Sequence, residues 1–198
     1  MSTPLVLLHG IGTGPEAWAA QVEAFSPSRR VLTPRVPLDL DDACGAVEAL
    51  SEPVVDVCGL SWGGLAALRY AVTRPERVGR IAVCAAFASL PMHLRALQRV
   101  LSVAVAVVPR APHELARPMR EGARFDVRGE VRSLRAPLLV LCGARDRVNT
   151  RPARALAELA PDALFELVPN AGHIANVDNP TAFTAALRRF LDEERTHG

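Results

Sequence analysis

The sequence contains no lysine, because all 23 of its basic residues are arginines. They stand against 21 acidic residues, for a formal net charge of +2, and they are scattered along the chain. A nucleic-acid surface needs basic side chains gathered in one patch or stripe, so we expect no nucleic-acid partner. We attribute the missing lysine to the coding bias of a GC-rich genome, since alanine and proline are also abundant.

Cysteine is scarce and lacks the spacing of a metal site. The four cysteines lie at positions 44, 58, 84 and 142, without a C-x-x-C pair. Three of them fall inside predicted buried strands, where cysteine behaves as a small apolar residue. The histidines at 93, 113 and 197 have no ligand-like spacing either. We therefore expect no disulfide, no metal and no cofactor.

Long hydrophobic runs are missing as well. The longest apolar stretch with membrane character, around 103–108, is far shorter than the roughly 20 residues that span a bilayer. The chain opens with Met1-Ser2-Thr3-Pro4 and continues directly into an apolar run, with no signal peptide pattern. These absences predict a cytoplasmic protein without a membrane partner.

What the chain does contain is an alternation of apolar runs and amphipathic segments. Apolar runs typical of buried strands lie at 5–8, 30–36, 54–58, 78–86, 137–143 and 164–168. Segments with helical spacing follow them, and the last begins at Asn179-Pro180, a favourable cap followed by a first-turn proline. Repeated βα units predict one α/β domain over 1–198, with a doubly wound, mainly parallel sheet of about six strands and helices on both faces.

Residues 87–134 interrupt the alternation. A helical stripe of apolar side chains is followed there by prolines that break the chain into short pieces. The stripe consists of Leu94, Leu97, Leu101 and Val105, and the prolines are Pro109, Pro112 and Pro118. We interpret this segment as a small helical lid over the sheet rather than another βα unit.

Residues 54–68, VVDVCGLSWGGLAAL, join an apolar strand to a helix through a glycine-flanked serine. Strand, G-x-S-x-G and helix together form the context of a nucleophile elbow. A tight turn at Ser61 leaves no room for nearby side chains, which would explain Gly59 and Gly63. From the pentapeptide alone, a plain βα turn with glycines for close packing stays an equal alternative.

Two more reactive residues follow predicted strands, where active sites of open parallel sheets form. Asp146 lies in CGARD, and His173 lies in PNAGH. A serine needs a base to take its proton, and a carboxylate orients the histidine that serves as that base. Alone, such an Asp is usually a turn residue and such a His a surface residue. In the order Ser, Asp, His they predict Ser61 as nucleophile, His173 as base and Asp146 as acid.

An oxyanion hole needs two N–H donors aimed at one point. We expect them to be the backbone N–H of Trp62 and that of Ile11 in the HGIGTG segment. His9 could serve as a second catalytic base, but we favour a role in structuring the loop. The same segment superficially resembles a dinucleotide fingerprint, yet it lacks the third glycine at its expected place and a suitable acidic residue downstream.

HGIGTG, GLSWGG, GARD and NAGHIANVDNP, in this order and over most of the chain, resemble the α/β-hydrolase superfamily. The pattern is most similar to its small esterases, lactonases and related C–O or C–C bond hydrolases. The resemblance assigns the same catalytic and oxyanion roles to the residues named above. Some members carry the acid after an earlier strand, but Ala85-Ala86-Phe87 has no carboxylate there.

The chain also departs from that family. It begins at the HG strand without the usual preceding hairpin, residues 34–38 replace a D-x-x-G-x-G-type turn, and the lid is short. We therefore expect a barer sheet edge, a monomer or dimer, and a shallow or open acyl pocket. Its predicted walls, which the spacing alone would equally place in the core, are Trp62, Phe87, Leu94, Leu97 and Leu101.

These features predict a serine hydrolase that cleaves a small-molecule carboxylic ester through an acyl-enzyme on Ser61. A lactonase, thioesterase or cyclase acting on a biosynthetic intermediate is the alternative, with a lactone or thioester as substrate. A non-catalytic ligand-binding protein on the same scaffold is a different class of answer. The presence of Ser, Asp and His together argues against it.

Overall fold

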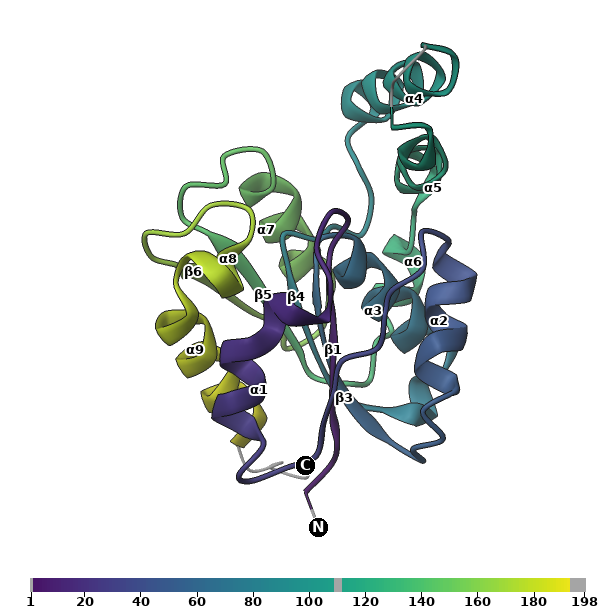
Figure 1. Ribbon diagram of the computed structural model, residues 1–198. Coiled ribbons are helices and arrows are strands. Elements are labelled where there is room, and N and C mark those ends of the chain that lie inside the picture. Colours follow the sequence, from purple (N-terminus) through teal and green to yellow (C-terminus); the bar gives the residue numbers. More distant parts are fainter. Residues whose placement is uncertain (1, 109–111, 193–198) are drawn as a thin grey trace.

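The computed structural model describes residues 2–108 and 112–192, which form a sheet between two layers of helices (Figure 1). Pro109 and His197, both named above, lie outside the described residues. In the described part, no helix is both long and apolar enough to cross a membrane.

The sheet has six strands in the order β2-β1-β3-β4-β5-β6, and every pairing is parallel. The strands are β1 (Leu5–Leu8), β2 (Val31–Leu32), β3 (Val55–Leu60), β4 (Val78–Cys84), β5 (Leu138–Gly143) and β6 (Leu164–Val168). This confirms the predicted doubly wound parallel sheet. The order reverses between β1 and β3, and such a switch point opens a crevice at the carboxyl ends of the strands.

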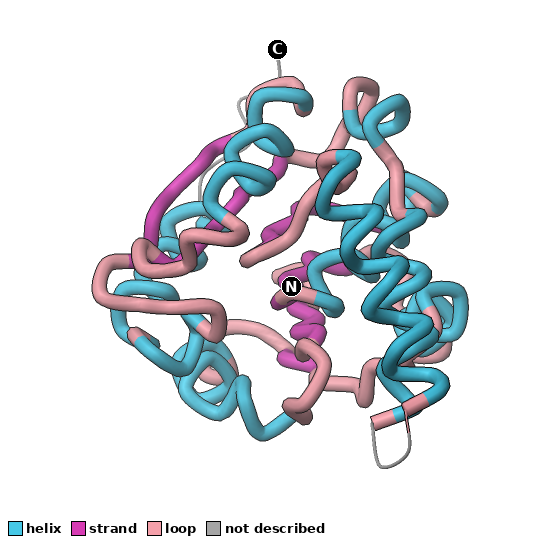
Figure 2. The backbone as a smooth tube through the Cα atoms, turned by 90° about the horizontal axis from the view of Figure 1, so that it is seen from above, coloured by secondary structure: helices cyan, strands magenta, loops and turns pink. Residues whose placement is uncertain are grey.

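Helices follow nearly every strand. They are η1 (Pro15–Trp18), α1 (Ala19–Phe25), α2 (Leu40–Glu48), α3 (Trp62–Thr73), η2 (Pro75–Arg77), α4 (Met92–Val107), η3 (His113–Leu115), α5 (Ala116–Arg124), α6 (Arg128–Val131), α7 (Thr150–Leu159), α8 (Ala175–Asp178) and α9 (Pro180–Asp192). Helices α1 and α9 cover one face of the sheet, and α2, α3 and α7 cover the other (Figures 1 and 2).

The period-two alternation of strand side chains creates two cores. Leu5 and Leu7 of β1 point to the α1 and α9 side, where Trp18 packs on Phe183 with ring centroids 5.8 Å apart. Val6 and Leu8 point to the opposite core, under α2 and α3. Three of the four cysteines are buried in strands as predicted, and all four are free.

Two predicted boundaries were wrong. The strand expected over 30–36 is only Val31–Leu32, because Pro34 and Pro37 lack the N–H that a ladder needs. Pro118 does not break the chain, since it lies in the first turn of α5, where its missing N–H removes no helical bond.

Helices α4 and α5 pack against each other above the carboxyl ends of the strands (Figure 1). An antiparallel bridge between Ser89 and Asp126 closes the base of this segment. Arg95 of α4 reinforces the closure, because its guanidinium lies 2.9 Å from the Asp126 carboxylate and also donates to Ser89 Oγ. These contacts therefore hold the two ends of the segment together, with α4 and α5 above the crevice.

Candidate active site

Ser61 occupies a sharp turn between β3 and α3. Its backbone has φ 53° and ψ −113°, a left-handed conformation that residues other than glycine rarely adopt. A Cβ atom on Gly59 would lie 2.2 Å from the Gly63 carbonyl oxygen, and one on Gly63 would lie 2.1 Å from the carbonyl oxygen of Leu8. Both positions therefore require glycine, and the turn projects Ser61 from the end of the sheet.

The three residues predicted to form a triad come together from three loops. His173 Nε2 lies 3.0 Å from Ser61 Oγ, and His173 Nδ1 lies 2.8 Å from Asp146 Oδ2. Ser61 follows β3, Asp146 follows β5 and His173 follows β6. The hydrogen-bonded chain therefore spans the carboxyl edge of the sheet.

Asp146 is held by a neighbour that the sequence patterns did not single out. The Asn149 side-chain amide donates to Oδ1 at 3.0 Å and Oδ2 at 2.8 Å, and its backbone N–H donates to Oδ1 at 3.2 Å. Burial on its own would raise the pKa of Asp146, but hydrogen bonds from His173 and Asn149 outweigh it and hold that pKa below its usual value. The carboxylate therefore stays ionised beside the histidine.

The loop that carries His173 rests directly on the end of β5. A Cβ atom on Gly143 would lie 2.0 Å from the Gly172 carbonyl oxygen, so this contact requires glycine. Arg145 N–H donates to the Ala171 carbonyl at 2.8 Å, and Gly172 N–H donates to Asp178 Oδ2 at 2.7 Å. The first bond joins the histidine loop to the aspartate loop, and the second joins the histidine loop to α8.

His9 structures its loop, as interpreted from the sequence. It is buried, and Val36 N–H donates to Nε2 at 3.0 Å. Because Nε2 accepts there, Nδ1 carries the proton and donates to the Gly10 carbonyl at 2.9 Å. Both ring nitrogens are therefore engaged by backbone, tying the segment after β1 to the segment after β2.

The two predicted oxyanion donors lie beside Ser61. Trp62 is the first residue of α3, so its N–H belongs to the opening N–H groups that find no partner inside a helix. Ile11 lies in the turn after β1, and both residues line the cavity that contains Ser61. The Trp62 indole itself is buried, with Nε1 donating to the Pro37 carbonyl at 2.8 Å.

A cavity of about 300 Å³ opens at Ser61 between the sheet and helices α4 and α5. It is lined by Ile11, Ser61, Trp62, Leu65, Ala85, Phe87, Leu90, Leu94, Leu97, Gln98, Leu101, Pro118, Met119, Gly122, Val148 and Asn149. All five predicted pocket residues are in this set. Leu97 and Leu101 are 54% and 44% exposed, so they belong to the cavity wall rather than to the core. The volume lies at the small end of the range for small-molecule sites.

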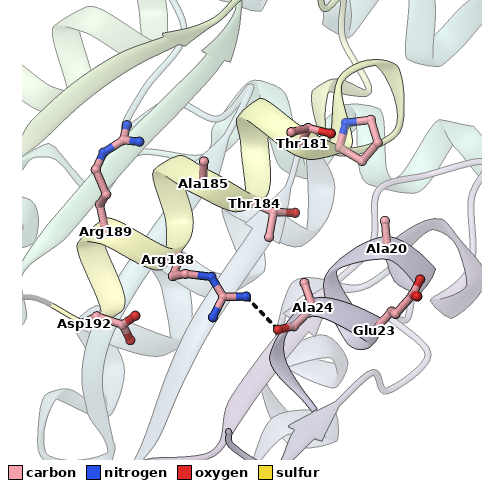
Figure 3. A pocket seen from close by; sticks show the side chains of 10 residues that line it. Ala20, Glu23, Ala24, Thr181, Thr184, Ala185, Arg188, Arg189 and Asp192 are labelled. Atoms are coloured by element: carbon pink, nitrogen blue, oxygen red, sulfur yellow. Dashed lines mark hydrogen bonds between the residues drawn. The ribbon is translucent and has the colours of Figure 1, made fainter. Parts of the chain in front are cut away.

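A larger hollow of about 960 Å³ lies between α1 and α9, on the outer side of their helical layer (Figure 3). Arg188 crosses it and donates to the Ala24 carbonyl at 2.7 Å. Glu23, Arg189 and Asp192 also line it, and none of its lining residues is a nucleophile paired with a base. Within the described residues, no group of three or more His, Cys, Asp or Glu side chains is arranged to hold a metal ion.

Comparison with known proteins identifies the family of the chain. A model of the Alpha/beta hydrolase family matches residues 5–187. The chain is 26% identical to 3-oxoadipate enol-lactonase 2 of Acinetobacter baylyi, over 94% of this chain and 88% of that protein. It is 28% identical to a pimeloyl-[acyl-carrier protein] methyl ester esterase of Stenotrophomonas maltophilia, over 94% of this chain and 92% of that protein.

Solved structures show the same fold. A hydrolase from Pseudomonas aeruginosa superposes with a TM-score of 0.82 at 24% identity, over 97% of this chain and 91% of that one. The enol-lactonase from Burkholderia xenovorans superposes with a TM-score of 0.79 at 24% identity, over 98% and 92%. The elements that carry Ser61, Asp146 and His173 thus lie within the span shared with these proteins.

Proposed function

This chain belongs to the α/β-hydrolase family, and from that premise we propose that it is a serine hydrolase that cleaves a carboxylic ester through an acyl-enzyme on Ser61. The observation that carries the proposal is the unbroken chain of hydrogen bonds from Ser61 Oγ through His173 to Asp146, at 3.0 Å and 2.8 Å. Such a chain provides a nucleophile, a base within reach of its proton, and an orienting carboxylate.

In the proposed reaction, His173 Nε2 takes the proton from Ser61 Oγ while the oxygen attacks the ester carbonyl carbon. The backbone N–H groups of Ile11 and Trp62 stabilise the resulting oxyanion. His173 then returns its proton to the leaving alkoxide, which departs as the alcohol. A water molecule, deprotonated by His173, attacks the acyl-enzyme; the carbonyl re-forms, the acid leaves, and Ser61 recovers its proton.

Asp146 stays ionised throughout this cycle. Its carboxylate accepts the Nδ1–H of His173, which selects the tautomer with a free Nε2 and stabilises the imidazolium in the transition state. The lowered pKa of Asp146 supports this role, because an ionised partner is needed over the whole working pH range. We propose that α4 and α5 act as the lid over the acyl site.

Lactone hydrolysis is the second candidate, because a full-length relative is an enol-lactonase. A lactone would follow the same steps, with the leaving alkoxide retained on the acyl chain. The methyl ester esterase relative, whose name refers to an acyl-carrier protein, adds carrier-bound acyl groups to the substrates worth testing. The cytoplasmic location and the monomeric or dimeric state stay predictions of the sequence.

Covalent labelling tests the proposal directly. A fluorophosphonate probe should modify wild-type protein at Ser61, identified by mass spectrometry of the labelled peptide. Ser61→Ala should abolish both the adduct and the hydrolysis of 4-nitrophenyl butyrate, whereas Ser133→Ala, at an exposed serine, should preserve both. Ester turnover that survives Ser61→Ala would disprove the assignment. Folded wild-type protein that binds esters but neither reacts nor turns them over would favour the non-catalytic alternative.

A further inference from the structure

Among residues 2–108 and 112–192, no charged side chain lines the cavity at Ser61. Its walls combine residues from the loops after β1, β3, β4 and β5 with residues of α4 and α5, and most of them are aliphatic or aromatic. Two arginines of α4 adjoin wall residues in sequence. Arg95 is committed to Asp126 and to backbone oxygen, and Arg99 is exposed and does not belong to the lining. A carboxylate bound here would lose its hydration without gaining a partner, which is strongly unfavourable.

Four lining residues carry polar side-chain atoms, and three of these are already engaged. Ser61 bonds His173, the Trp62 indole donates to Pro37, and the Asn149 amide donates to Asp146. Gln98, which lies on α4, is the fourth. Its Oε1 is buried and has no hydrogen-bond partner among the residues that the structure describes.

The position of Gln98 on α4 points its side chain towards the cavity wall. Leu94 and Leu101 lie four residues before and three after it, so they share its helical face, and both line the same cavity. Across from it is Gly122 of α5, where a Cβ atom would approach the Gln98 amide nitrogen to 3.3 Å. A leucine at position 98 would continue the apolar wall, whereas the glutamine places an unsatisfied acceptor in it.

Buried polar groups in folded proteins are nearly always hydrogen-bonded, and an exception calls for an explanation. Leaving an acceptor unpaired in a binding cavity is unfavourable in the free protein and is relieved when a ligand supplies a donor. We propose, building on the serine hydrolase function, that Gln98 is a specificity-determining residue. It accepts a hydrogen bond from a hydroxyl group on an otherwise apolar, uncharged acyl chain.

The proposal makes two statements about substrates. Among acyl groups of equal shape, one with a hydroxyl that reaches Gln98 is preferred over one without it. An acyl group with a carboxylate in the same place is rejected. A phenyl ring is a suitable carrier for these groups, because cavities of about 150 Å³ accommodate benzene and this one measures about 300 Å³.

The test compares kcat/KM for 4-nitrophenyl esters of 3-phenylpropanoate, of its meta- and para-hydroxy derivatives, and of its para-carboxylate derivative. Wild-type protein should prefer one of the hydroxy esters over the unsubstituted ester by about tenfold, and should disfavour the carboxylate ester by about a hundredfold. Gln98→Leu should remove the hydroxyl preference, so that the hydroxy and unsubstituted esters have equal kcat/KM. Gln98→Arg should instead improve turnover of the carboxylate ester.

Val100→Ala is the matched control, because Val100 lies on α4 but is 66% exposed and outside the cavity. It should leave the three kcat/KM ratios to the unsubstituted ester unchanged. A hydroxyl preference that persists in Gln98→Leu, the absence of any preference in wild-type protein, or equal turnover of the carboxylate and unsubstituted esters would overturn the proposal.

A binding measurement separates this proposal from the proposed reaction. Calorimetry with the corresponding primary amides and the Ser61→Ala variant reports on the cavity without requiring turnover. If wild-type protein shows no hydrolysis and no Ser61 adduct, the serine hydrolase function is wrong. Selective binding of the hydroxy amide, lost in Ser61→Ala/Gln98→Leu, would still support the role of Gln98, and unselective binding would overturn it.

Discussion

The side-chain amide of Asn149 donates hydrogen bonds to both carboxylate oxygens of Asp146, at 3.0 Å and 2.8 Å. The same carboxylate accepts from His173 at 2.8 Å. The proposed acid is therefore fixed from its own loop as well as by the histidine, because Asn149 comes only three residues after it. Asn149 thus acts together with His173 to orient Asp146 and to keep it ionised.

Asn149→Leu should lower kcat by about five- to a hundredfold, the range for removing one partner of a buried charged group. Hydrogen bonds to the ionised form lower the pKa of Asp146, so their loss raises it. The decline of kcat on the acid side should then begin at a higher pH than in wild-type protein. Arg147→Ala, at an exposed neighbour, should keep the wild-type profile. An unchanged acid limb in Asn149→Leu would contradict the positioning role.

The turn at Ser61 should store measurable strain. Ser61→Gly should be more stable than Ser61→Ala by about 1 kcal/mol, because glycine adopts φ 53° without steric cost. The midpoints of urea unfolding compare the two variants, neither of which is expected to hydrolyse esters. At Ser133, where φ is not positive, the order should reverse, since glycine there only adds freedom to the unfolded chain. Equal midpoints at position 61 would refute stored strain.

Arg29 and Asp56 form an ion pair that is almost fully buried. Their atoms lie 2.9 Å apart, with side chains only 8% and 7% exposed. Arg29→Leu should cost about 3–5 kcal/mol in the free energy of unfolding, because it removes the main partner of a buried carboxylate and leaves it only the smaller interactions with Arg80. Arg29→Leu/Asp56→Leu should recover most of this loss. Arg30→Leu is the matched control, since Arg30 is 65% exposed in its pair with Glu52 and should cost at most about 1 kcal/mol.

The Arg29–Asp56 pair also predicts how the stability loss of Arg29→Leu changes with pH. Burial raises the pKa of Asp56, although Arg29 opposes that shift, and without Arg29 the pKa should rise further. An acid whose pKa is higher in the folded state destabilises the protein above that pKa, and the penalty disappears as the pH falls below its unfolded value. The difference in the free energy of unfolding between Arg29→Leu and wild-type protein should therefore decrease as the pH is lowered. A deficit independent of pH would contradict a buried charge as its cause.

The effect of Asp126 on stability should have the opposite pH dependence to that of Asp56. Hydrogen bonds from Arg128 and Arg95 together outweigh the opposing effect of burial and hold the pKa of Asp126 well below its usual range. Its contribution is present above the unfolded pKa and is lost as the pH falls towards the folded value. Asp126→Asn should therefore unfold at lower urea concentration near neutral pH and converge with wild-type protein in acid. Asp162→Asn, at an exposed carboxylate, should unfold like wild-type protein throughout.

The sequence alone was sufficient for the sheet and for the order of its reactive residues. Continuous apolar runs mark strands buried on both faces, and residues directly after such strands lie at one edge of a parallel sheet. Ser61, Asp146 and His173 could therefore be selected without coordinates. The glycines around Ser61 carried the same kind of local information, because a missing side chain is visible in the sequence itself.

Prolines were less informative because their effect depends on where an element begins. Pro34 and Pro37 shortened β2 to two residues, while Pro118 fitted into the first turn of α5. Helical spacing likewise could not separate core from cavity. Phe87 is buried, whereas Leu97 and Leu101 face open space, and an apolar residue gives the same pattern in both environments.

Only the tertiary structure decided which polar groups meet. Asn149 could have capped a helix, and Gln98 could have faced water, because each is an ordinary residue for its segment. Their roles depend on the partners that they meet in the fold: Asn149 meets the Asp146 carboxylate, and Gln98 Oε1 meets no donor within the described residues. Secondary structure depends on local spacing, which the sequence displays directly. Which partner a polar side chain bonds, and how much water it loses, depends on how its segment packs against the others, and this packing exists only once the chain has folded.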